Sequence, residues 1–156
     1  MKSILTITVF MMKMRIMIKK TVLKILIGMQ IIDIKNLKKN IFNHLKNLGV
    51  QAVEVGFAAA SDMDYEACTT LSEMADGNVV ISALVRAVDK DILKAIESIQ
   101  AAPKKRIHTF IAMSEFNMKY VLQKEPDDVK KLAIDAVKHA KSLIGENGDV
   151  QFSVEH

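Results

Sequence analysis

Two periods of apolar residues along positions 40–156 predict strands that alternate with helices. Runs rich in apolar and β-branched residues are typical of strands buried in a parallel sheet, and they occupy 51–57, 78–86, 106–112 and 149–154. Between these runs, apolar residues recur every three or four positions, which predicts amphipathic helices. The chain is therefore expected to be a series of β/α units whose chemistry lies where the strands end.

Local signals place the ends of the predicted helices. A helix over 36–48 is expected to end at Gly49, which occupies the usual position of a C-terminal cap. The candidates for capping the next two helices are Ser61, Asp62 or Asp64 for the first and Asp89 for the second. Residues 114–125 are predicted to be a connection, and Pro126 suits the first turn of a long helix that follows it.

The order of these elements predicts an α/β fold with a parallel sheet. No glycine-rich phosphate loop follows any predicted strand, which argues against a dinucleotide-binding or P-loop fold. A (β/α)₈ TIM barrel is the natural alternative, but such a barrel needs about 200 residues or more. With 156 residues, the chain is expected to form a partial barrel, about half of one.

Charge divides the chain into two unequal segments. The first forty residues carry nine Lys or Arg and one acid, so the remainder carries thirteen bases and seventeen acids. We therefore interpret 1–39 as an atypical basic, apolar N-terminal segment that is distinct from the partial TIM barrel expected at 40–156. The overall charge of +4 belongs to the first segment and is poor evidence for nucleic-acid binding.

The basic segment does not resemble a membrane anchor. Its apolar run, 4–12, has only about half of the roughly 20 residues that a membrane span needs. Its bases follow the apolar run, whereas a signal peptide places them before it. A membrane-surface helix is disfavoured relative to a strand or irregular segment, because the apolar positions keep no clean helical period. The single cysteine, Cys68, excludes an internal disulfide and suits the cytoplasm.

Three charged residues on the predicted strands are candidates for chemistry. Glu54 lies in a strand expected to be buried, where a carboxylate needs a partner. It either forms a salt bridge or reaches water at the strand end, or it supplies an acid at the rim of a site, and these interpretations stay open. His108 is expected toward the far end of its strand, and Arg86 at the end of its own strand can bind an anionic substrate or pair with Glu54 or another acid. No local metal-ligand cluster is visible.

Several runs together resemble the family of 2-isopropylmalate synthases, within a group that includes homocitrate and citramalate synthases. The resemblance covers about 40–155 and is carried by Val53-Glu54-Val55-Gly56-Phe57, Ile81-Ser82-Ala83-Leu84-Val85-Arg86-Ala87, Arg106-Ile107-His108-Thr109-Phe110-Ile111-Ala112 and Val150-Gln151-Phe152-Ser153-Val154-Glu155. It implies a (β/α)₈ barrel and an acyltransferase that condenses acetyl-CoA with 2-oxoisovalerate in leucine biosynthesis.

The same resemblance implies roles for individual residues. His108 and Ser153 would line the pocket for the oxo acid, Glu155 would be among the catalytic groups, and Glu54 would belong to the pocket wall. Arg86 remains a candidate for substrate binding. A divalent metal (Mg, Mn or Zn) is implied, because in such enzymes it chelates the oxo acid and polarises the carbonyl.

The departures from the family pattern concern the metal. The first-strand motif Asp-Thr-Thr-Leu-Arg-Asp-Gly-Glu-Gln has no match in 1–40, the His-x-His pair does not occur, and the usual Phe-Ser-x-Glu-Asp reads Phe-Ser-Val-Glu-His at 152–156. The protein ligands of the metal are therefore expected to be absent from this chain, which is expected to be inactive alone. A non-catalytic half-barrel that self-associates and a fragment of a homocitrate or citramalate synthase remain as alternatives, and open sheet edges favour a homo-oligomer.

Overall fold

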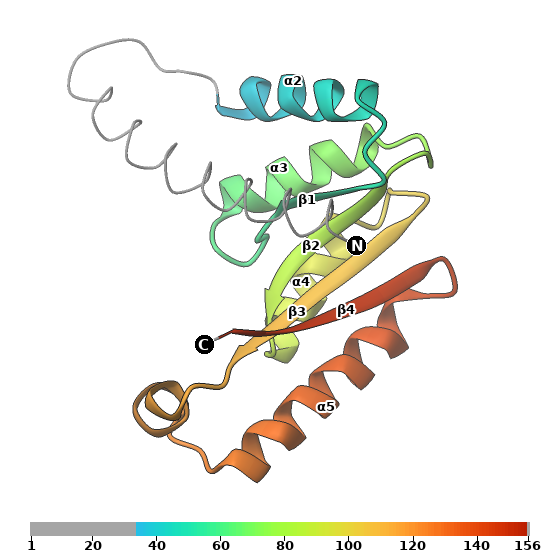
Figure 1. The fold of residues 1–156 in the computed structure, drawn as a ribbon. Helices are drawn as coiled ribbons and strands as arrows, with labels where there is room; N and C mark the ends of the chain where they lie inside the picture. The colour runs from blue at the N-terminus through green and yellow to red at the C-terminus, as the bar shows by residue number, and fades with distance from the viewer. Residues whose placement is uncertain (1–33, 156) are drawn as a thin grey trace, which may run out of the picture.

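The computed structural model describes residues 34–155, so the interpretations of the basic segment before residue 34 lie outside it (Figure 1). Along the chain, the elements are α2 (Ile34–Asn47), β1 (Ala52–Gly56), α3 (Asp62–Glu73), β2 (Val80–Arg86), α4 (Asp89–Ser98), β3 (Lys105–Ala112), the π-helix η1 (Asn117–Leu122), α5 (Pro126–Ile144) and β4 (Gly148–Glu155). No helix within this part of the chain is long and apolar enough to cross a membrane.

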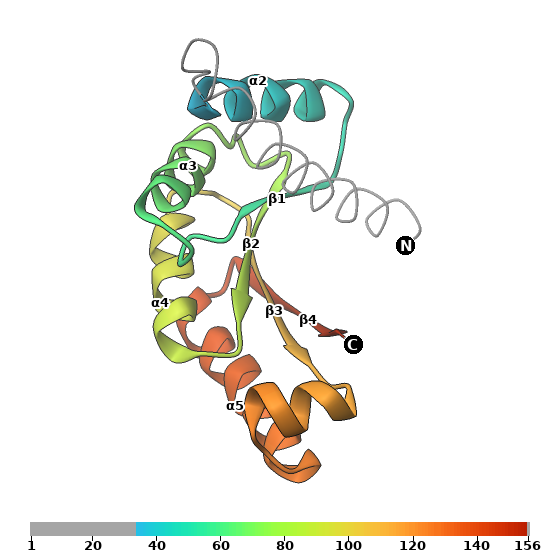
Figure 2. The same ribbon diagram turned by 90° about the vertical axis from the view of Figure 1, so that its left-hand side faces the viewer.

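The four strands form one parallel sheet in the order β1-β2-β3-β4, which confirms the predicted architecture. Helices α3, α4 and α5 each lie between two successive strands along the chain. Figure 2 shows all three on the same side of the sheet. Helix α2 lies next to α3, near β1 (Figure 1). This arrangement corresponds to about half of a (β/α)₈ barrel.

Strict alternation along the strands gives the sheet two different faces. Residues such as Ile81, Val85 and Ile107 belong to the buried apolar core that the helices cover, and we call this side the helix face. The residues between them lie on the opposite face, which also carries the apolar side chains of Leu84 and Phe110. We call it the polar face after its polar members, which are Glu54, Ser82, Arg86, Arg106, His108, Asp149, Gln151, Ser153 and Glu155. The side chains that carry chemistry are therefore separated from the core by the sheet itself.

Two of the expected helix ends behave differently. Ser61 caps α3, because its Oγ accepts a hydrogen bond from the backbone N–H of Asp64 at 3.1 Å. Asp89, by contrast, does not cap α4, and that prediction was wrong. The extended residue Val88 holds the cap position without a side-chain hydrogen bond, and Asp89 is the first helical residue. A carboxylate in the first turn is favoured by the positive end of the helix dipole.

The segment 114–125, predicted to be a connection, contains the short π-helix η1. The hydroxyl of Ser114 accepts a hydrogen bond from the backbone N–H of Asn117, and Met118 and Leu122 pack against the core. The helix ends at Leu122, and the following cap residue, Gln123, adopts a left-handed conformation with φ +53°. Spacing of the two apolar residues by four positions was the signal for this helix.

A β-bulge interrupts the alternation in β1. Glu54 pairs with Ser82, but the next pair joins Gly56 to Ala83, so β1 has one extra residue at this point. Gly56 has φ +148°, and a Cβ there would lie 3.3 Å from the Sγ of the buried Cys68. The backbone of Gly56 therefore turns toward the helix face, and the following Phe57 is freed from the position that alternation would give it.

Close packing at the start of β4 leads to a stability prediction. A Cβ at Gly148 would lie 2.9 Å from both methyl carbons of Ile144, at the end of α5. We expect Gly148→Ala to lower the free energy of unfolding by about 1–3 kcal/mol, because the core has no room for the extra carbon. Urea denaturation measures this. In an Ile144→Ala background the same substitution should be much less destabilising, and an equal loss in both backgrounds would contradict the packing explanation.

Candidate active site

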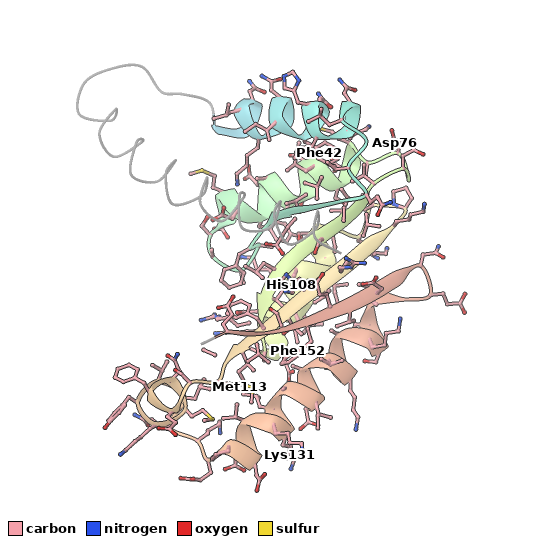
Figure 3. All side chains as sticks on the ribbon, in the orientation of Figure 1. Phe42, Asp76, His108, Met113, Lys131 and Phe152 are labelled. Carbon is pink, nitrogen blue, oxygen red and sulfur yellow. The ribbon has the colours of Figure 1, made fainter. Side chains whose placement is uncertain are left out.

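A chain of hydrogen bonds joins three strands on the polar face and centres on the imidazole of His108. The His108 Nδ1 lies 2.7 Å from Oε2 of Glu54, and its Nε2 lies 2.9 Å from Oγ of Ser153. Figure 3 labels His108 near the middle of the sheet. The carboxylate comes from β1, the imidazole from β3 and the hydroxyl from β4. Three residues that the sequence singled out separately are thus in direct contact.

Strand register explains how Glu54 reaches His108 across β2. Glu54 pairs with Ser82, whereas His108 pairs with Leu84, so the bond runs diagonally and passes over β2. Two strands of a sheet that are separated by a third lie about 10 Å apart, a gap that two long side chains can bridge. Ser82 lies on β2 directly beside Glu54 on the same face, and its side chain is small. Sequence reasoning did not single out Ser82, because serine in a strand carries no signal of its own.

Burial gives the hydrogen bonds of His108 their importance. The side chains of His108 and Glu54 are 8% and 11% exposed, so neither polar group can rely on water. An ionised carboxylate only accepts hydrogen bonds, so Nδ1 of the ring donates to Glu54. In the neutral ring Nε2 then accepts the hydroxyl proton of Ser153. The arrangement fixes the imidazole and can hold a proton between the ring and the serine oxygen.

Arg86 lies at the end of β2 but does not pair with Glu54. Its Nε donates to Oδ2 of Asp91 at 2.6 Å, and this hydrogen bond raises the pKa of Arg86. Asp91 is a buried residue in the first turn of α4 that sequence reasoning did not single out. Its spacing from Arg86, five residues across a strand-to-helix turn, was the available signal.

The other expected site residues lie at different positions along their strands. His108 is the fourth of eight residues in β3, and the expectation that it lies toward the strand's far end was therefore wrong. Ser153 and Glu155 do lie near the carboxyl end of β4. Glu155 pairs with Ala112, and its backbone carbonyl accepts a hydrogen bond from Met113.

The described residues do not fit the divalent metal that the resemblance implies. Among 34–155, no three His, Cys, Asp or Glu side chains are close enough together to hold a metal ion. On the polar face, Glu54 already contacts His108, and Asp149 makes two 2.7 Å bonds to Arg106. These carboxylates therefore have partners within the protein.

The buried contact between Glu54 and His108 is expected to contribute measurably to stability. In a double-mutant cycle with Glu54→Ala and His108→Ala, we expect a coupling energy of about 1–3 kcal/mol, because each single substitution leaves a buried polar group unpaired. Chemical denaturation of the four proteins measures it. The matched control is the Lys94–Asp62 pair, in which the Asp62 side chain is 99% exposed and the coupling should be close to zero. Equal coupling in both cycles would contradict the assigned importance of burial.

Comparison with known proteins identifies the family. The HMGL-like family model matches residues 29–156. A 2-isopropylmalate synthase 2 of Leptospira interrogans is 47% identical over 119 residues, which cover 76% of this chain and 28% of that protein. A 2-isopropylmalate synthase of Pyrococcus abyssi is 45% identical over 118 residues, covering 76% of this chain and 24% of that protein. The chain thus spans about a quarter of the length of these relatives. It belongs to the HMGL-like family, and its fold is a partial α/β TIM barrel.

Proposed function

We propose that this chain carries part of the acyl-transfer site of a 2-isopropylmalate synthase, the enzyme that condenses acetyl-CoA with 2-oxoisovalerate in leucine biosynthesis. The observation that carries the proposal is the hydrogen-bond chain Glu54–His108–Ser153 on the polar face. The names of the similar proteins support the family of reactions. We also propose the cytoplasm as the compartment, with which a single, buried cysteine that cannot form an internal disulfide is compatible.

Each residue of the site has a proposed role. His108 and Ser153 line the pocket for the oxo acid, with the serine hydroxyl directed by the imidazole. Glu54 holds the imidazole in one orientation and forms part of the pocket wall. Glu155 follows Ser153 by two positions in β4, on the same face, and is assigned to acid–base catalysis. Arg86 is assigned to an anionic group of a substrate.

The reaction needs more than the described residues supply. The methyl group of acetyl-CoA loses a proton, the resulting carbon nucleophile attacks the carbonyl of 2-oxoisovalerate, and water then cleaves the thioester and releases the CoA thiol. In the related enzymes a divalent metal would polarise that carbonyl, but the described donor set does not fit a metal, so we assign no step to it. We therefore propose that the chain alone binds the oxo acid weakly and does not turn it over. A homocitrate or citramalate synthase origin is the alternative within the same class.

The exposed apolar surface at β4 favours a second candidate function, a self-associating half-barrel. β4 is an outer strand of the sheet, and its helix-face side chains Phe152 and Val154 are 37% and 61% exposed. Figure 3 shows Phe152 between β4 and α5. A strand edge beside such a surface favours association of like chains into a homo-oligomer.

The proposed site can be tested by binding and turnover. Ligand-observed NMR should detect 2-oxoisovalerate bound to the full chain, with a signal at least five-fold weaker for His108→Ala, because that substitution removes the centre of the hydrogen-bond chain. Thiol release from acetyl-CoA with 2-oxoisovalerate and Mg²⁺, Mn²⁺ or Zn²⁺ should not exceed the blank without oxo acid.

The control for binding is Lys94→Ala, because Lys94 forms an exposed ion pair on α4. An undiminished signal for folded His108→Ala would contradict the proposed pocket. Release of thiol that depends on the oxo acid would contradict the proposal of inactivity. Stronger binding of 2-oxoglutarate or pyruvate than of 2-oxoisovalerate would favour the homocitrate or citramalate alternative.

Self-association is tested by analytical ultracentrifugation over a range of concentrations. We expect the chain to form dimers or larger species, and we expect Phe152→Ser combined with Val154→Thr to weaken this association at least ten-fold, because both side chains project from the edge strand. Leu93→Ser is the matched control, since Leu93 is 45% exposed on α4, away from that edge. A monomer at all concentrations would exclude the half-barrel assembly.

A further inference from the structure

Arg86 differs from Arg106, although both arginines lie on strands of the same sheet. Arg106 uses three nitrogens within the protein: Nε and Nη2 each bond to Asp149 at 2.7 Å, and Nη1 donates to Gln151 at 3.3 Å. Arg86 uses only Nε, in its bond to Asp91. Within residues 34–155, its two terminal nitrogens have no hydrogen-bond partner, and its side chain is 55% exposed. The guanidinium of Arg106 is thus fully used within the protein, whereas that of Arg86 keeps its two terminal nitrogens available as a fork of hydrogen-bond donors.

Asp91 accepts the one hydrogen bond that Arg86 donates within the described part of the chain, through Nε. Its side chain is only 3% exposed, and it lies in the first turn of α4, where the helix dipole favours a negative charge. The 2.6 Å bond from Nε therefore anchors the guanidinium to a buried, fixed carboxylate. A bond through Nε leaves the end of the guanidinium open, where one N–H of each Nη group points outward in the end-on geometry that matches two oxygens of a carboxylate or phosphate.

Phe57 supports the flat side of the same group. The Cζ of Arg86 lies 5.6 Å from the centre of the Phe57 ring, within the range of a cation–π contact. The β-bulge at Gly56 explains this contact, because strict alternation would have directed Phe57 to the helix face. Two independent contacts therefore restrain a largely exposed side chain, which otherwise would lose considerable conformational freedom on binding a ligand.

The fork also lies in register with the candidate active site. Arg86 pairs with Phe110, and Phe110 pairs with Ser153, so Arg86 and Ser153 belong to one row across the sheet. Their backbones are two strand spacings apart, or about 10 Å. A substrate in contact with Ser153 could thus extend an anionic group toward the strand end that carries Arg86.

We propose that Arg86 is an oxyanion-binding group at the carboxyl rim of the sheet and that Asp91 is its positioning residue. The ligand is a carboxylate or phosphate group. Assigning that group to the oxo acid or to the CoA thioester rests on the proposed function. The existence of the anion site does not rest on it. Asp91 acts through Arg86 and does not touch the ligand. Arg106, with its nitrogens occupied, is a structural ion pair without this role.

The site is tested by titrating the full chain with inorganic phosphate, acetate, 2-oxoisovalerate and CoA. Binding is measured by isothermal titration calorimetry and NMR. At least one anion should bind, and Arg86→Gln should weaken it ten-fold or more. Arg86→Lys should recover only part of the affinity, because an ammonium group keeps the charge but lacks the fork. Phosphate and CoA affected together would identify a phosphate ligand, and acetate and 2-oxoisovalerate affected together would identify a carboxylate ligand.

Asp91→Asn distinguishes positioning from general stability. At a temperature where circular dichroism shows the variant folded, it should weaken the anion at least three-fold and remove the protected Nε–H resonance of Arg86. Arg106→Gln is the matched control and should lower stability without weakening anion binding. The proposal is wrong if no anion binds, if Arg86→Gln leaves affinity unchanged, or if Arg106→Gln weakens binding equally. Asp91→Asn with unchanged affinity would refute the positioning role. None of these outcomes depends on turnover, so a failure of the proposed reaction is separately recognised.

Discussion

Two hydrogen bonds to one imidazole ring link β1, β3 and β4 on the side of the sheet opposite the helices. The bonds of His108 at 2.7 and 2.9 Å require that Glu54 and Ser153 both point to this face. A shift of any of these strands by one residue would move its polar side chain into the apolar helix layer. The ring therefore depends on the register of the whole sheet, and burial makes an incorrect register costly.

The strands of this fold could be predicted to within about two residues from sequence alone. A parallel strand is buried on the helix face along most of its length, and the resulting apolar runs, such as that around Ile107 and Ile111, are readily visible. The π-helix η1 was missed because polar residues surround Met118 and Leu122, the two side chains that pack against the core. The cap of α4 was misassigned because a carboxylate in the first helical turn and one at the cap position give similar sequence signals.

The candidate site was predictable as a set of residues but not as a network. Glu54 was expected to need a partner, yet that partner lies 54 positions away and across an intervening strand. The pairing register of the strands brings the two residues together, and a single sequence does not show that register. The partner of Arg86, in contrast, is set by local structure. The turn from β2 into α4 brings Asp91, only five residues later, back to the strand end.

The bulge in β1 separates a part of this short strand that packs in the core from the following part of the chain, which contacts Arg86 at the end of the sheet. Val53 before the bulge and Val55 within it belong to the core, whereas Phe57 after it contacts Arg86. Because the extra residue absorbs the change of direction, side chains at position 57 can vary without disturbing the pairing of the residues that precede the bulge. Relatives that share this backbone could thus diversify the rim aromatic, and with it the choice of anion, while the sheet beneath remains the same.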